Sequence, residues 1–191
     1  MGSNMMLTIG AILLFGLFLS SSNRMMIGNN QIASQNEYYI TGMSLAQSII
    51  DEAKTKAFDQ STVNADTAVV ARSSMTAPGS LGPGAGETVP STDTLSSLAP
   101  YSSTNKGYMS AVKFNDVDDY NKYTRRVNTP RAEGYVLTVT VNYATETNPD
   151  NVEIVRTYCK KMTVQVTSPY FPKAGTESGP STLTVFYAFT Y

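Results

Sequence analysis

The sequence MMLTIGAILLFGLFL at residues 5–19 is apolar except for one threonine and two glycines. No charged residue precedes Arg24, and no proline precedes Pro78. Because proline is the residue that most strongly breaks a helix interior, the sequence allows one helix to continue from Met5 to Phe58. We therefore predict a long N-terminal helix that is apolar at its start and amphipathic at its end.

The apolar stretch alone is short for a membrane span. As a helix its 15 residues extend about 22 Å, whereas the hydrocarbon core is roughly 30 Å thick. Extension to Ile27 gives a full span but includes Arg24, whose position after the stretch favours the orientation opposite to export. A basic leader removed before Met1 would resolve that conflict. A cleaved signal peptide is the alternative, but the basic residues that open such a peptide are missing, so we expect a retained helix.

The later part of the predicted helix carries an apolar stripe that repeats at steps of three and four residues. We expect this stripe to lie on a sheet, with Asp51 and Glu52 among the polar residues that point elsewhere. The residues predicted to pack between helix and sheet are Ile40, Met43, Ala46, Ile50, Ala53 and Ala57.

The remainder of the chain, 59–191, is predicted to be a globular β-rich head. Residues 76–107 are dominated by Ser, Thr, Pro and Gly and are expected to form a long surface loop. Apolar and polar residues alternate over Tyr135–Tyr143, which predicts a strand. A last strand is predicted where five apolar residues share one face: Leu183, Val185, Tyr187, Phe189 and Tyr191. Further candidate strands are Thr67–Arg72, Tyr108–Phe114 and Val152–Thr167, the last with a bulge near Cys159–Lys161. The predicted fold class is α+β, a long hydrophobic helix (1–58) whose C-terminal half packs on an antiparallel sheet.

Composition argues against several classes of function. The net charge of −1 gives no electrostatic basis for binding nucleic acid. The chain has no histidine, so it lacks the commonest general base, and we expect it not to be an enzyme. Cys159 is the only cysteine, which excludes an intrachain disulfide and a thiolate metal cage.

The segment FNDVDDY at residues 114–120 concentrates carboxylates. Asp116, Asp118 and Asp119 could begin a calcium site, because calcium prefers carboxylate and carbonyl oxygens. No glycine or distal glutamate completes a known calcium loop, so a solvated acidic turn is the favoured interpretation. We expect no other cofactor.

The order of a long N-terminal helix, a variable loop and an antiparallel sheet resembles the type IV pilin superfamily, which includes the pseudopilins. Residues Ser44–Asp59 (SLAQSIIDEAKTKAFD) look like the segment where a minor-pilin helix leaves the membrane zone. Phe114–Tyr120, followed by a strand starting at Gly134, is similar to the head of such proteins. The sequence departs from the family at Met5, where a glutamate is usual at the fifth mature position, and in lacking a C-terminal disulfide loop. Archaeal flagellin-like filaments have a similar apolar N-terminal helix without that glutamate and are an alternative resemblance.

The resemblance implies a structural subunit of an extracellular filament that lies in the inner membrane before assembly. Its partners would be identical subunits, a leader peptidase, an assembly platform and an ATPase. The alternatives are a low-copy pseudopilin of a secretion system and a membrane-anchored extracytoplasmic binding module. The side chains expected to form the filament core are Met5, Leu7, Ile9, Ile12, Leu13, Leu14, Phe15, Leu17, Phe18 and Leu19.

Overall fold

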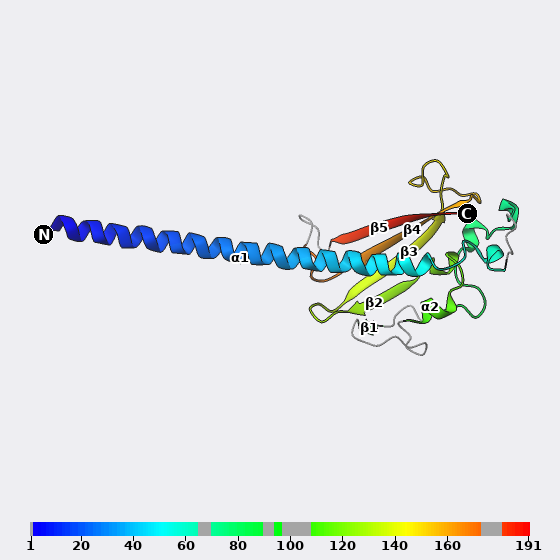
Figure 1. The fold of residues 1–191 in the computed structure, drawn as a ribbon, viewed down its shortest axis with the longest axis horizontal. Coiled ribbons are helices and arrows are strands. Elements are labelled where there is room, and N and C mark those ends of the chain that lie inside the picture. The colour runs from blue at the N-terminus through cyan, green and yellow to red at the C-terminus, as the bar shows by residue number, and fades with distance from the viewer. Residues whose placement is uncertain (1, 65–69, 90–93, 97–107, 173–180) are drawn as a thin grey trace. The chain divides into compact units, whose positions relative to one another are not determined.

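The computed structural model describes residues 2–64, 70–89, 94–96, 108–172 and 181–191 (Figure 1). The chain divides into two compact units, Met1–Tyr38 and Tyr39–Tyr191. Helix α1 (Gly2–Ala53) contains all described residues of the first unit and supplies the first element of the second. The division therefore falls inside the helix rather than at its end, because the last turns of α1 are buried within the second unit.

The second unit is built on one five-stranded sheet with the strand order β1-β2-β3-β4-β5. Strands β2 to β5 are antiparallel neighbours, and β1 pairs with β2 in parallel. The predicted α+β arrangement of an apolar helix and an antiparallel sheet is confirmed at this level. The strands are β1 (Thr94–Ser96), β2 (Thr124–Asn128), β3 (Tyr135–Tyr143), β4 (Cys159–Thr167) and β5 (Thr182–Thr190). The short helices are α2 (Met109–Lys113) and the 3-10 turns Gln60–Thr62, Arg72–Ser74, Pro78–Ser80 and Asp118–Tyr120.

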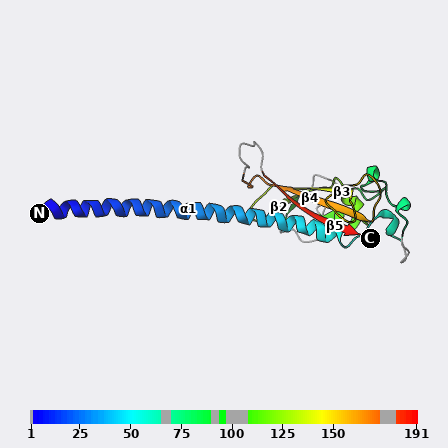
Figure 2. The same ribbon diagram turned by 90° about the horizontal axis from the view of Figure 1, so that it is seen from above.

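The core of the second unit lies between the last turns of α1 and one face of the sheet (Figure 2). Alternate residues of β3 are buried, while Thr138 and Thr140 between them are exposed, as expected for a strand covered on one side. The fully buried side chains include Ile49 and Ile50 from α1, Leu137, Val139 and Val141 from β3, Val164 and Val166 from β4, and Val117.

The packing stripe on α1 differs in part from the predicted one. Ala46, Ile50 and Ala53 are buried, but Ile40 and Met43 are 65% and 54% exposed. Ala57 is half-buried and lies beyond the end of the helix. The buried line instead starts at Gly42, where an added β-carbon would lie only 2.8 Å from the ring of Phe171. A side chain at this position would require the Phe171 ring to shift.

Three of the predicted strands differ from the structure. Within the predicted strand Tyr108–Phe114, residues Met109–Lys113 form the helix α2 instead, and the edge of β2 away from β3 pairs with β1. The return strand is shorter than predicted and starts at Cys159, without the bulge; Val152 makes only an isolated bridge to Ala144. Residues 67–69 of the candidate strand Thr67–Arg72 lie outside the described residues, Val70 and Ala71 belong to no strand, and Arg72 begins a 3-10 turn.

The Ser/Thr/Pro/Gly-rich segment 76–107 is described only in part. Its described residues include the turn Pro78–Ser80, the buried side chain of Leu81 and the strand β1. The strand β1 is an addition that the composition of the segment does not indicate, and the rest of the surface-loop prediction stays a prediction.

Candidate functional site

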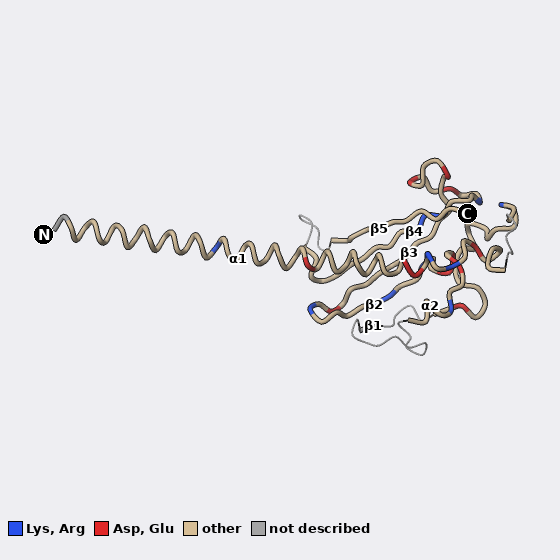
Figure 3. The backbone as a smooth tube through the Cα atoms, viewed as in Figure 1, with Lys and Arg blue, Asp and Glu red and all other residues tan. Residues whose placement is uncertain are grey.

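The first unit presents an apolar helical surface. Every large apolar side chain of Met5–Leu19 is exposed, from 48% at Ile9 to 80% at Met6. The hydroxyl of Thr8 donates to the carbonyl oxygens of Asn4 and Met5, at 3.0 and 2.9 Å, so its donor is used within the helix. This part of α1 carries no charge before Arg24 (Figure 3). The ten residues predicted as filament core all lie on this exposed surface.

Length and composition make α1 a candidate membrane-spanning or signal-like helix. Backbone groups inside a helix are hydrogen-bonded to one another, which is the condition for entering hydrocarbon. The exposed surface is therefore suited to an apolar environment of either kind, lipid or protein.

A polar cluster joins the end of α1 to β2. Glu52 accepts hydrogen bonds from Ser110 Oγ at 2.6 Å and Tyr120 Oη at 2.9 Å on one carboxylate oxygen. Its other oxygen pairs with Arg125 at 2.8 Å, and Arg125 is buried. The prediction that Glu52 points away from the sheet is wrong, because the charge of Arg125 and two hydroxyl donors compensate for its partial burial.

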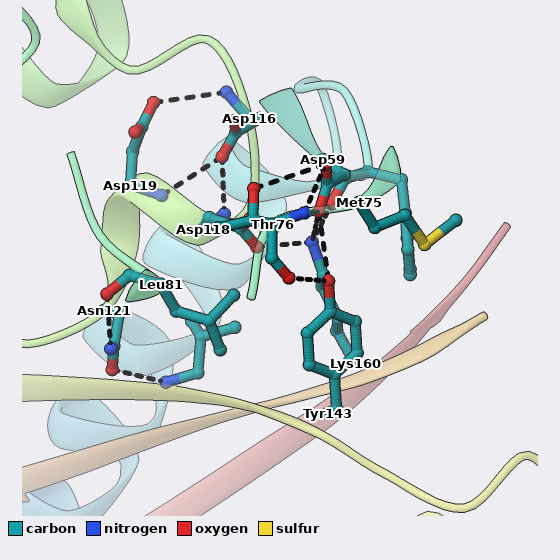
Figure 4. A network of polar contacts seen from close by, with 12 residues as sticks. Asp59, Met75, Thr76, Leu81, Asp116, Asp118, Asp119, Asn121, Tyr143 and Lys160 are labelled. Carbon is teal, nitrogen blue, oxygen red and sulfur yellow. Dashed lines mark hydrogen bonds and ion pairs between the residues drawn. The ribbon is translucent and has the colours of Figure 1, made fainter. Parts of the chain in front are cut away.

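The acidic turn is buried rather than solvated. Asp116, Asp118 and Asp119 are each 1% exposed, and the carboxylates of Asp116 and Asp119 accept hydrogen bonds from backbone N–H groups of the turn itself (Figure 4). Burial, together with the charges of its two acidic neighbours, raises the pKa of Asp116 to about 8. Burial also raises the pKa of Asp119. In the described parts of the chain, no group of three or more His, Cys, Asp or Glu residues is arranged to hold a metal ion.

The third carboxylate of the turn faces a lysine. Lys160, on β4, is 0% exposed, and its Nζ lies 2.5 Å from Asp118 Oδ1 and 2.7 Å from Asp59 Oδ2 (Figure 4). Nζ also donates to the carbonyl oxygen of Phe58 at 2.9 Å. This lysine therefore connects the sheet to the residues that follow α1 and to the acidic turn.

Sequence reasoning did not identify Glu52, Arg125, Asp59 or Lys160 as connected residues. One available signal was Lys160, which shares the inward face of β4 with Met162, Val164 and Val166. A lysine at an inward position of an apolar strand requires a buried acidic partner. Asp59 and Asp118 are separated from it by 101 and 42 residues, so no local pattern identifies them as those partners.

Comparison of the chain with protein-family models, with curated proteins and with solved structures finds no match.

Proposed function

We propose that the chain is a structural subunit of an extracellular type IV pilus-like filament, assembled through its hydrophobic N-terminal helix. The observation that carries the proposal is the exposure of every large apolar side chain of Met5–Leu19. The inner membrane would hold this surface before assembly, and identical helices would cover it afterwards. The likeness of this fold, a long helix packed by its C-terminal half on an antiparallel sheet, to that of a type IV pilin is part of the same proposal.

The energetic argument concerns where such a surface can reside. Full burial of one Leu, Ile or Phe side chain contributes about 1.5–3 kcal/mol, so the whole segment gains on the order of 10 kcal/mol or more by leaving water. Lipid satisfies this requirement for a single chain. A bundle of identical helices satisfies it equally well, and polar heads limit the association to the helices.

The variant Leu13→Glu tests the proposal, because Leu13 is 64% exposed near the middle of the apolar segment. A carboxylate among packed apolar helices lacks a partner, so we expect filaments to be lost from material sheared off the cell surface. Negative-stain microscopy of that material provides the measurement. The matched control is Leu13→Met, which nearly conserves volume and should leave filaments intact.

A charge can also reduce insertion into the membrane, by about 2.5–3.5 kcal/mol at a helix centre. Filament yield is therefore expressed per subunit found in the membrane fraction. Normal filaments from Leu13→Glu at equal membrane content would refute the proposal.

The alternatives predict other distributions of the wild-type chain. A low-copy pseudopilin would be scarce in the sheared material, and a membrane-anchored binding module would be extracted by detergent as monomers without forming regular assemblies. Abundance in sheared fibres favours the filament subunit over both.

A further inference from the structure

The buried amino group of Lys160 donates all three of its hydrogens to acceptors in the protein. They are donated to the carbonyl oxygen of Phe58, to Asp59 Oδ2 and to Asp118 Oδ1, at 2.9, 2.7 and 2.5 Å. An ammonium group has three donors and no lone pair. If the proton shared with Asp118 passes to that carboxylate, the lone pair that appears on Nζ faces the Asp118 carboxyl group. The other two contacts hold the nitrogen in that orientation.

The two carboxylates beside Lys160 differ in their surroundings. Asp59 accepts hydrogen bonds from the Ser61 and Thr76 backbone N–H groups and from the Tyr143 hydroxyl, as well as from Lys160. Although burial acts in the opposite direction, its contacts with Lys160 and Ser61 lower the pKa of Asp59 far below its usual range, so it stays ionised.

Asp118 is the less stabilised anion. Its Oδ2 is buried and has no hydrogen-bond partner among the described residues. Burial raises the pKa of Asp118 to about 6 against the opposing effect of Lys160. Asp118 is therefore the carboxylate that can accept the proton and become an electrophilic carboxylic acid, while Asp59 remains a charged acceptor.

The side chains of Lys160 and Asp118 are 0% and 2% exposed, so bulk water does not reach the pair, and aromatic rings lie beside it. Nζ of Lys160 lies 4.5 Å from the centre of the Phe58 ring and 5.1 Å from that of Tyr143. Removing each ion of the pair from water has a desolvation cost, whereas a neutral amide of the same atoms has no charge to desolvate. Because the two groups are held in contact, their reaction is intramolecular, and each meets the other at an effective concentration of about 10⁵ M or more.

We propose that Lys160 and Asp118 join in an intramolecular isopeptide bond between Nζ and Cγ. The ammonium gives one proton to Asp118, and the neutral amine attacks Cγ of the resulting acid. The attacking nitrogen then loses a second proton, which Asp59 Oδ2 can accept and pass to the departing hydroxyl. One N–C bond forms, one C–O bond breaks and one water leaves, so an ammonium and a carboxylate become an amide and water without any added reagent.

The bond would close a covalent loop between the 3-10 turn Asp118–Tyr120 and β4, across 42 residues. Such a closure restricts the unfolded chain in the way that a disulfide does. With Cys159 as its only cysteine, the chain has no disulfide within it to do this. The inference does not depend on the proposed function, although a subunit exposed outside the cell would benefit from the closure.

Trypsin digestion of the full-length protein, extracted in detergent and denatured, tests the bond by mass spectrometry. An acylated Lys160 resists cleavage, so peptide 114–122 should be recovered joined to peptide 157–161, lighter than their sum by one water. Recovery of peptide 114–122 only in its free form would overturn the proposal. A link from Lys160 to peptide 57–72, which contains Asp59, would overturn the assignment of Asp118 as the partner.

The same digest contains an internal control. Lys161 lies 2.9 Å from Asp150, a similar contact, but the Asp150 side chain is 70% exposed. This pair should stay unlinked, because hydrated charges keep their protons and water remains in contact. The variants Lys160→Arg and Asp118→Ala should abolish the linked species completely. Since the wild-type digest decides the question alone, failure of a variant to fold would not obscure the result.

Discussion

Asp116 is a buried carboxyl group on which two effects act in opposite directions. Its Oδ1 accepts the backbone N–H groups of Asp118 and Asp119, at 2.6 and 3.2 Å, which holds the turn in shape. Burial and the neighbouring carboxylates nevertheless raise its pKa to about 8. The two hydrogen bonds require an oxygen acceptor but not a charge, so they persist in the protonated acid. Burial and the neighbouring carboxylates therefore make the protonated form of Asp116 the favoured one below pH 8.

We predict that Asp116→Asn becomes progressively more stabilising, relative to wild type, between pH 5 and pH 8. The folded pKa lies above the ordinary value of 3.8, so the stability from this group is complete below pH 4 and is lost as the pH rises through 8. The amide keeps the acceptor and does not ionise. The difference at pH 8 should be at least about 1 kcal/mol, roughly 2–4 °C in melting temperature.

Thermal unfolding in detergent at the two pH values measures this effect. Asp150→Asn is the control, since it removes an exposed carboxylate. If Asp116→Asn shifted the melting temperature equally at both pH values, the assignment of a raised pKa would be wrong.

Glu52 and Asp51 are adjacent acids with opposite environments. Glu52→Gln would leave the guanidinium of Arg125, which is 6% exposed, facing a neutral amide, and would replace one accepting oxygen by a donor. We expect a loss of about 2–4 kcal/mol. Asp51→Asn changes only exposed contacts, with Lys54 and Gln47, and should leave the melting temperature nearly unchanged. Similar melting temperatures for the two variants would contradict the role of the Glu52 cluster.

At the scale of elements, α1 contains glycines in two different settings. A β-carbon at Gly42 would lie 2.8 Å from the ring of Phe171, which is itself stacked on Tyr39 with ring centroids 4.6 Å apart. A β-carbon at Gly28 would meet nothing within 4 Å. Gly42→Ala should therefore destabilise the second unit by about 1–3 kcal/mol, since the aromatic ring must shift.

The matched variant Gly28→Ala should not destabilise the chain, because alanine favours helix by roughly 1 kcal/mol over glycine. Melting temperatures of both variants in detergent provide the comparison. A Gly42→Ala protein as stable as the Gly28→Ala protein would show that the helix does not approach Phe171 as closely as the structure indicates.

The elements that sequence predicted correctly are those with a local periodic signal. The span Tyr135–Tyr143 coincides with β3, and Leu183–Tyr191 overlaps β5, because apolar residues recur at every second position of each. Within Tyr108–Phe114, residues Met109–Lys113 form α2 instead of a strand, and the strand that pairs with the outer edge of β2 is β1.

The polar clusters could not be predicted from local patterns. Glu52 looks like a solvent-facing helix residue until Arg125, which is 73 residues away, is placed opposite it. The sequence of the acidic turn predicts a solvated turn, whereas in the structure the turn is buried and Asp118 contacts Lys160. Such contacts depend on topology, and a short window of sequence carries only the weaker signal of a lysine among inward apolar residues.

For the whole molecule, the proposed filament assembly depends on one property, the exposed apolar surface of Met5–Leu19, which contains no charged residue. The second unit has its own core and its own internal ion pairs. We therefore expect the Leu13→Glu variant to lose assembly while the melting temperature of the head in detergent stays within about 2 °C of wild type.

Cryo-electron microscopy of fibres sheared from wild-type cells provides a direct test of assembly through the Met5–Leu19 segment. We predict a helical filament of this chain in which the Met5–Leu19 segments of neighbouring subunits contact one another along the axis, with the β-sheet units outside. Fibres of this chain in which residues 5–19 are absent, or lie on the outer surface, would contradict the account.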